Sequence, residues 1–243
     1  MVLHKKFVII EGIDGAGKGV VSDALMDFLS SEGFRILDLR KENADLTRKD
    51  SGFFKKYDVI LTCEPTYFSA GLELREKMLK NLPKYTARQV AEKFAEDRDA
   101  LYSKVLLPAL ENGLIIVQDR SVVSSFVYQV NQAAGSKENL SLEDVEKMNK
   151  VALSNPPGLL IVQNVDPQAA YSRLHKRTEK QDNTDFEKIE ALKKNAEGYS
   201  SKKWREVLEK KEVEIKDLDC NAEIEDVKRN SIKILREYLN KIN

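Results

Sequence analysis

Short apolar runs alternate along the chain with longer stretches in which apolar residues recur every three or four positions. The first pattern is typical of buried strands and the second of amphipathic helices. Their alternation favours an α/β fold with a mainly parallel sheet. The strand candidates are residues 7–11, 35–39, 59–62, 114–118, 159–165 and 213–215.

The helical stretches lie between these strand candidates. Thr86 is expected to be an N-cap, and Gly113 and Gly158 are expected to end elements. The predicted helices are residues 19–31, 70–81, 86–112, 141–154, 167–177, 187–211 and 222–240.

Residues 41–57 are polar, charged and weakly periodic, which indicates a surface excursion between two strand candidates. The sequence has neither internal repeats nor a linker rich in proline, glycine or serine, so we expect a single domain over residues 1–243. The four apolar residues 7–10 are too few for a signal-peptide core, and no stretch reaches the roughly 18 apolar residues of a membrane helix.

Charge is balanced over the chain. Lys and Arg number 40, Asp and Glu number 40, and the formal net charge is +0. This balance argues against binding of nucleic acid through a basic excess, but not against a local basic site. Two cysteines, Cys63 and Cys220, are too few for a disulfide scaffold and fit a reducing compartment. We therefore expect a cytoplasmic protein that binds neither nucleic acid nor membrane.

A glycine-rich segment between the first strand and the first helix is the strongest chemical signal. Two glycines five positions apart precede Lys18, as in a phosphate-binding loop, where main-chain N–H groups and the helix N-terminus attract phosphate. Lys18 is expected to bridge the terminal phosphates, and a glycine-rich turn without a ligand is the alternative. The predicted nucleotide-binding residues are Gly12, Ile13, Asp14, Gly15, Ala16, Gly17, Lys18, Gly19 and Val20.

The residue after Lys18 departs from the usual pattern. Gly19 stands where a Ser or Thr hydroxyl normally contacts Mg²⁺, and Ser22 lies about one helical turn too far along to replace it. Asp119, at the end of an apolar strand, is the candidate magnesium ligand, because ligands gather at the carboxyl ends of strands in open α/β sheets. An aspartate that pairs with its neighbour Arg120 is the alternative.

Together these motifs resemble the thymidylate kinase family from about residue 3 to about residue 225. The most specific stretch runs from Pro108 to Gly113 and on to Asp119-Arg120. Further matches are Asp14, Glu64-Pro65, Phe94, Arg98, Ser124, Ser125, Tyr128, Gln129, Val165-Asp166-Pro167, Arg173 and Arg177. The resemblance implies a three-layer P-loop NTPase fold with a mostly parallel five-stranded sheet, an insertion at about 41–57 and a small helical lid at about 173–188.

The resemblance also implies the reaction, which is phosphorylation of dTMP to dTDP with ATP and Mg²⁺ in dTTP synthesis, and it implies a homodimer. In this family pattern Asp14 binds the sugar 3′-hydroxyl, Phe94 stacks on thymine and Arg98 contacts the base. Ser125 lies near the base edge, and Tyr128 presses against the sugar where a 2′-hydroxyl would be.

The remaining roles concern the phosphates. By the same resemblance Arg75 and Arg120 hold the acceptor phosphate, and Glu64 belongs to the acceptor site. Asp119 holds Mg²⁺, and the lid closes over ATP. The predicted catalytic residues are Lys18, Arg120, Arg173 and Arg177.

Several positions depart from the family pattern. Cys63 and Thr66-Tyr67 replace an arginine and glycines around the Glu-Pro pair, and the lid sequence Thr184-Asp185-Phe186-Glu187 lacks the arginine of the family. Phosphoryl transfer then depends on the remaining lid cations, which are Arg173, Arg177, Lys176 or Lys180. Because loss of one such arginine costs ~10³-fold or more in rate, these departures leave a kinase of reduced activity as an alternative.

Two alternatives remain open on sequence alone. A deoxynucleoside kinase would use Glu64 as a base, and Ser121 after Asp119-Arg120 favours that family. A catalytically weakened nucleotide-binding homologue is favoured by Gly19. The sequence does not decide among thymine, uracil and cytosine, which differ by one or two groups.

Overall fold

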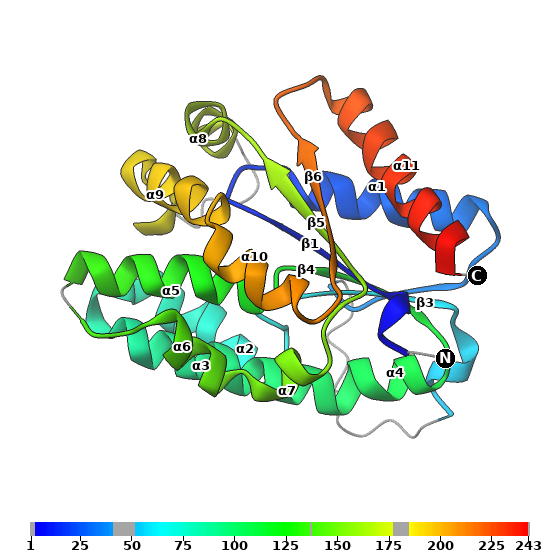
Figure 1. Ribbon diagram of the computed structural model, residues 1–243, viewed down its shortest axis with the longest axis horizontal. Coiled ribbons are helices and arrows are strands. Elements are labelled where there is room, and N and C mark those ends of the chain that lie inside the picture. Colours follow the sequence, from blue (N-terminus) through cyan, green and yellow to red (C-terminus); the bar gives the residue numbers. More distant parts are fainter. Residues whose placement is uncertain (1–2, 41–51, 137, 177–184, 243) are drawn as a thin grey trace.

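The computed structural model describes residues 3–40, 52–136, 138–176 and 185–242 (Figure 1). Its strands form one sheet in the order β2-β3-β4-β1-β5-β6, and every neighbouring pair is parallel, as the sequence predicts. The strands are β1 (Phe7–Gly12), β2 (Ile36–Asp38), β3 (Val59–Cys63), β4 (Ile115–Asp119), β5 (Leu159–Asn164) and β6 (Glu214–Asp219).

The expected number of strands, five, was wrong, because the sheet has six. The two segments where the family resemblance implied one strand form β2 and β3, and they pair with Ile36 opposite Val59. Each is a strand-length apolar segment at the sheet, and pairing satisfies main-chain groups that would otherwise lie buried without partners. All six apolar segments of the sequence therefore enter the sheet.

Helices cover both faces of the sheet (Figure 1). One face carries α1 (Lys18–Ser31) and α11 (Ile224–Ile242), which contact each other. The other face carries α3 (Ala87–Leu101), α4 (Leu107–Glu111) and α5 (Val122–Ser136). The remaining helices are α2 (Ser69–Glu73), α6 (Leu142–Met148), α7 (Lys150–Ser154), α8 (Pro167–His175), α9 (Ile189–Tyr199) and α10 (Lys202–Glu209).

Helix α5 has no counterpart among the predicted helices. Every residue from Val122 to Gln129 is buried, on all sides of the helix. A helix that is buried all round lacks the alternation of apolar and polar positions by which an amphipathic helix is identified. Burial on all sides of this first half is therefore the reason why the sequence pattern did not predict the helix.

The longest predicted helices are interrupted. The stretch 86–112 divides into α3, a π-helical turn (η6, Tyr102–Leu106) and α4, and Pro108 near the start of α4 cannot donate to the preceding turn. Thr86 caps α3 as predicted, because its Oγ accepts from the N–H of Gln89 at 3.1 Å. The stretch 187–211 divides into α9 and α10, and Ser201 caps α10.

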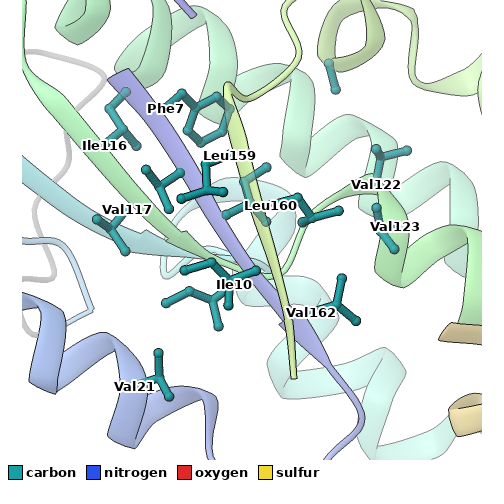
Figure 2. Close-up of a cluster of buried hydrophobic side chains, with 14 of the residues drawn as sticks. Phe7, Ile10, Val21, Ile116, Val117, Val122, Val123, Leu159, Leu160 and Val162 are labelled. Atoms are coloured by element: carbon teal, nitrogen blue, oxygen red, sulfur yellow. The ribbon is translucent and has the colours of Figure 1, made fainter. Parts of the chain in front are cut away.

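The core lies between the sheet and its helices (Figure 2). It gathers apolar side chains from β1, β4 and β5 with others from α1 and α5, and Phe7, Val21 and Leu160 are fully buried. Burial of one such side chain contributes about 1.5–3 kcal/mol, so this cluster stabilises the packing of the helices against the sheet.

Part of the predicted surface excursion at 41–57 lies outside the described residues, which resume at 52. Its last part contains one short 3₁₀ turn, η3 (Phe54–Lys56), and the Phe54 side chain is buried in the core. Within the described part of the chain, no helix is both long and apolar enough to cross a membrane.

The loop after β1 packs closely on α8. Gly15 has a φ of +79°, and a Cβ placed there would lie 2.5 Å from the carbonyl oxygen of Ala170. Gly113, which follows α4, has nearly the same φ of +81°, but a Cβ placed there would meet nothing within 4 Å. The two glycines therefore separate the cost of a left-handed backbone from the cost of a steric clash.

We expect Gly113→Ala to lower the free energy of unfolding by about 1–2 kcal/mol, because only the backbone is strained. Gly15→Ala should cost about 1–3 kcal/mol more, because α8 must also shift. Urea unfolding of both variants beside the wild type measures the difference. Equal losses would contradict the close approach of this loop to α8.

Candidate active site

The carboxyl ends of β1, β3 and β4 open into one cavity of about 1010 Å³. This volume is at the upper end of the range for small-molecule sites. Helices α1, α3 and α5 and the short turn η7 (Asp185–Glu187) complete its walls. The predicted site residues that line it are Asp14, Gly15, Gly17, Lys18, Gly19, Val20, Glu64, Arg75, Phe94, Asp119, Arg120, Ser125 and Tyr128.

The glycine-rich loop folds around Lys18. Gly12 has a φ of +148°, and a Cβ there would lie 2.9 Å from the carbonyl oxygen of Gln163, so the loop requires glycine at this position. The Lys18 ammonium donates to the carbonyl oxygens of Gly12 at 3.1 Å and Ile13 at 3.0 Å. Burial lowers the pKa of Lys18, and the positive charge of Arg120 lowers it further. A phosphate in this loop would offset both effects.

Arg120 lies at the centre of the cavity wall. Its guanidinium donates to the Asp14 carboxylate and, at 3.1 Å, to the Ser124 hydroxyl. The Tyr128 hydroxyl donates to the other Asp14 oxygen at 3.1 Å. Burial alone would lower the pKa of Arg120, but the Asp14 carboxylate raises it above its ordinary value. The side chain therefore presents a fixed positive charge to the cavity.

The backbone of Arg120 is in a conformation unusual for a residue with a side chain. Its φ is +70°, in the left-handed region. Its N–H donates to the Ile10 carbonyl at 2.9 Å, and its carbonyl accepts from the Gln118 amide at 2.9 Å. Such strain persists where surrounding contacts over-determine the residue, and it is concentrated at functional sites.

Asp119 ends β4 beside Lys18. Its Oδ1 is buried and has no hydrogen-bond partner among the described residues, although the carboxylate lines the cavity. Arg120 pairs with Asp14, so the pairing of Asp119 with its neighbour, which the sequence left open, is not what the structure shows. An orphaned carboxylate oxygen beside a phosphate-binding loop fits Mg²⁺, which takes one or two carboxylates and completes its shell with phosphate and water.

The position after Lys18 offers no hydroxyl to a metal. The Ser22 hydroxyl is fully buried and donates to the Lys18 carbonyl at 2.9 Å, which agrees with the expectation that it cannot replace a Ser or Thr at position 19. A Cβ at Gly19 would meet nothing within 4 Å. Asp119 is therefore the protein group that best fits the ion, and there is open space where a hydroxyl would normally stand.

Glu64 and Arg98 form a buried ion pair behind the cavity wall. Each side chain is 1% exposed, and Arg98 Nε lies 3.0 and 2.9 Å from the two Glu64 oxygens. The guanidinium also donates to Asn149 and reaches the Ser125 hydroxyl at 3.4 Å. Glu64 lines the cavity, whereas Arg98 lies behind it and reaches it through Ser125.

Arg75 extends along the loop after β3. Its Nε donates to the carbonyl oxygens of Pro65 at 2.9 Å and Thr66 at 3.2 Å, and its guanidinium lies 3.9 Å from the centre of the Tyr67 ring. Burial raises the pKa of the Cys63 thiol to about 12, so this side chain adds no charge. Arg75, which lies 3.4 Å from the Cys63 sulfur, places a cation beside this neutral thiol.

Comparison with known proteins decides the family. The family model described as thymidylate kinase matches residues 53–231, which is more than half of the chain. The chain belongs to the thymidylate kinase family. A thymidylate kinase from Caldicellulosiruptor saccharolyticus is 27% identical over 239 residues, which cover 97% of this chain and 98% of the relative.

A solved structure is similar in fold. The crystal structure of thymidylate kinase from Ehrlichia chaffeensis matches with a TM-score of 0.60 and 19% identity, over 95% of this chain and 97% of that chain. At this identity the likeness shows the fold, a parallel sheet flanked by helices. Family membership makes the chain an ATP-dependent nucleoside monophosphate kinase. The glycine-rich loop at residues 12–19 precedes the matched range.

The predicted lid cations of this member of the thymidylate kinase family differ in where the structure places them. The Arg173 guanidinium donates to the Cys220 carbonyl at 2.8 Å and does not line the cavity. Arg177 and Lys180 lie outside the described residues, as does half of the expected lid at 173–188. Lys176 does line the cavity.

Aromatic residues from two distant segments meet on the wall of the cavity. Phe94 on α3 and Phe186 on η7 both line it and pack on one apolar cluster. The Phe186 ring lies edge-on to Tyr128, with 5.1 Å between ring centroids. The predicted stacking residue therefore lies in an aromatic environment suited to a planar base.

Sequence reasoning gave no role to three residues at the site. Arg40 lines the cavity and is paired with two aspartates, and Gln129 is a buried lining residue on α5. Glu11 is fully buried at the end of β1 and accepts from a group of hydroxyls. A single charge inside a buried apolar strand is a signal that could have identified Glu11.

We expect Glu64→Ala to lower the free energy of unfolding by about 3–5 kcal/mol, because it leaves the buried charge of Arg98 without its partner. The control is Asp58→Ala, which breaks the exposed pair with Arg35 and should cost about 0–1 kcal/mol. Chemical denaturation of both variants measures the two losses. A Glu64 variant as stable as the Asp58 variant would contradict the importance of the buried pair.

Proposed function

We propose that the cavity binds dTMP and ATP together, and that the chain transfers the γ-phosphoryl group of ATP to the phosphate of dTMP. One observation supports this most directly. Lys18, Arg75 and Arg120, from three separate segments, line the same cavity as the aromatic residues Phe94 and Tyr128. Two anionic substrates would repel each other in one cavity unless fixed cations lay between them.

The donor would occupy the phosphate-binding loop. There the main-chain N–H groups and the N-terminus of α1 would hold the ATP phosphates, and Lys18 would leave its carbonyl partners for the terminal phosphates. Asp119 would hold Mg²⁺, which neutralises charge on the phosphates when it is bound. Lys176, Arg177 and, after movement, Arg173 are the proposed cations for the transferred group.

The acceptor would lie on the other side of Arg120. Arg120 and Arg75 would hold its phosphate, and Phe94 would stack on the base. Ser125, oriented by Arg98, would face the base edge, and this indirect contact would replace the direct contact of Arg98 that the family resemblance implies. The Asp14–Tyr128 pair would lie at the sugar, where the ring leaves little room for a 2′-hydroxyl.

We also propose that residues 1–243 act as one kinase domain, because strands and helices from both ends of the chain belong to one sheet and its covering layers. Cytoplasmic location is supported by two free buried cysteines. Homodimerisation, which the family pattern implies, is tested by the mass of the protein in light scattering. The balanced charge supports the expectation that nucleic acid is not a partner.

We expect the purified protein to convert dTMP to dTDP with ATP and Mg²⁺ and to leave thymidine unphosphorylated, because its cations need a phosphate to bind. Chromatography of the products distinguishes the two acceptors. Phosphorylation of thymidine alone would support the deoxynucleoside kinase alternative instead. The pairing of both Glu64 oxygens with Arg98 and Gln118 argues against Glu64 as the base that this alternative requires.

Lys18→Ala should lower kcat by roughly 10²–10³-fold or more, because a fixed charge at the transferred phosphates is lost. The control is Lys6→Ala, since Lys6 Nζ donates to the Gly113 carbonyl at the far end of β1 from the site. A coupled ADP assay measures both rates. Full activity in the Lys18 variant would show that the loop is not the ATP site.

Gly19→Ser should lower the KM for MgATP by roughly three- to tenfold, the effect of about 1 kcal/mol from one added hydroxyl ligand. There is open space for this side chain. Gly19→Ala is the matched control, because it changes the backbone in the same way without a hydroxyl. Identical KM values for the serine and alanine variants would show that no metal lies within reach of position 19.

A further inference from the structure

A buried carboxylate lies directly beneath the cavity. Glu11, at the end of β1, is fully buried and accepts hydrogen bonds from the Ser121 hydroxyl at 2.8 Å, the Ser124 hydroxyl at 2.9 Å and the Tyr199 hydroxyl at 2.7 Å. It also accepts from the Ser124 N–H at 3.2 Å. Donation by several groups satisfies both oxygens and compensates for the loss of water around the charge.

Tyr199 comes from a distant part of the chain. It is the last residue of α9, the helix that follows η7, and it is 2% exposed. Its ring lies edge-on to Tyr128, with 6.4 Å between centroids, and its hydroxyl lies 3.1 Å from the Ser124 hydroxyl. Each hydroxyl has one hydrogen, and the carboxylate of Glu11 is the stronger acceptor for both.

The same network reaches Arg120. Ser124 gives its hydrogen to Glu11 and accepts from Arg120 Nη1 at 3.1 Å. The other end of the guanidinium pairs with Asp14. Because the backbone of Arg120 is left-handed at a φ of +70°, contacts to its side chain help to hold a conformation that is otherwise unfavourable.

We propose that Tyr199 and Glu11 are positioning residues for Arg120. The hydroxyl of Tyr199 fixes the carboxylate of Glu11, the carboxylate fixes the Ser124 hydroxyl, and that hydroxyl aims the Arg120 guanidinium at the acceptor phosphate. The inference rests on the proposed role of Arg120 as a phosphate contact. It assigns a function to the end of α9, a helix with no residue on the cavity wall.

Loss of this network should affect the binding of one substrate more than the binding of the other. Arg120 contacts the acceptor in the proposed arrangement, whereas the loop and Lys18 hold ATP. Loss of one hydroxyl that orders Arg120 should therefore weaken the binding of the acceptor nucleotide more than the binding of ATP. Charge-assisted hydrogen bonds are about twice as strong as neutral ones, so the effect is large enough to measure.

The test is Tyr199→Phe, which removes the hydroxyl and retains the buried ring. We expect the KM for dTMP to rise about tenfold while the KM for ATP stays within about twofold. The matched control is Tyr238→Phe, because Tyr238 is also buried and its hydroxyl donates to the Lys5 carbonyl at 2.7 Å, at the opposite edge of the sheet. The control should lose stability without any change in either KM.

A second variant, Ser124→Ala, removes the next hydroxyl in the network and should show the same split between the two KM values. In a double-mutant cycle, Tyr199→Phe combined with Ser124→Ala should cost less than the two single effects added together, because Tyr199 and Glu11 act on Arg120 through the Ser124 hydroxyl. Additive effects, or equal changes in both KM values, would overturn the positioning role.

The activity of the wild type with dTMP distinguishes failure of the positioning role from failure of the proposed function. If the wild type phosphorylates dTMP and Tyr199→Phe behaves as the Tyr238 control does, the positioning role fails and the function stands. If the wild type does not phosphorylate dTMP, the proposed function fails first. In that case unchanged affinity of the Tyr199 variant for dTMP, measured by calorimetry, would still overturn the positioning role.

Discussion

Buried charge at the carboxyl edge of the sheet is the constraint on which the site depends. A charge removed from water costs several kcal/mol unless a partner compensates for it. Arg98 has Glu64, Arg120 has Asp14, and Glu11 has its hydroxyl donors. The partners in each case belong to different segments of the chain. The charges can therefore enter the site only after the sheet has brought these segments together, and a chain of zero net charge can still hold a local positive site.

The parallel sheet, the position of the glycine-rich loop and most of the residues on the cavity wall could be predicted from the sequence. Each of these depends on local patterns. Apolar runs of strand length mark the strands, the glycine spacing before Lys18 marks the loop, and carboxylates such as Asp119 lie where parallel strands end. The cap at Thr86 is likewise a local pairing with Gln89. Local patterns survive folding because neighbouring residues in sequence remain neighbours in space.

The remaining features depend on packing that no local pattern records. The first half of α5, Val122 to Gln129, is buried on all sides, so apolar and polar positions do not alternate there. The spacing of Arg98 from Phe94 was evident, but its enclosure by Glu64 and Asn149 requires β3 and the end of α6 to approach α3. The network around Glu11 joins residues up to 188 positions apart. The sixth strand is a different case, because its apolar segment was evident in the sequence and only the family pattern implied five strands.

The central claim is that the cations of the cavity recognise the phosphate of the acceptor nucleotide. Calorimetric titration of the protein with dTMP and with thymidine, at low salt and without ATP, tests it most directly. Two charge-assisted contacts from Arg75 and Arg120 predict binding of dTMP at least about 100-fold tighter than binding of thymidine. Equal affinity for the two ligands would contradict the account, because the phosphate would then contribute nothing.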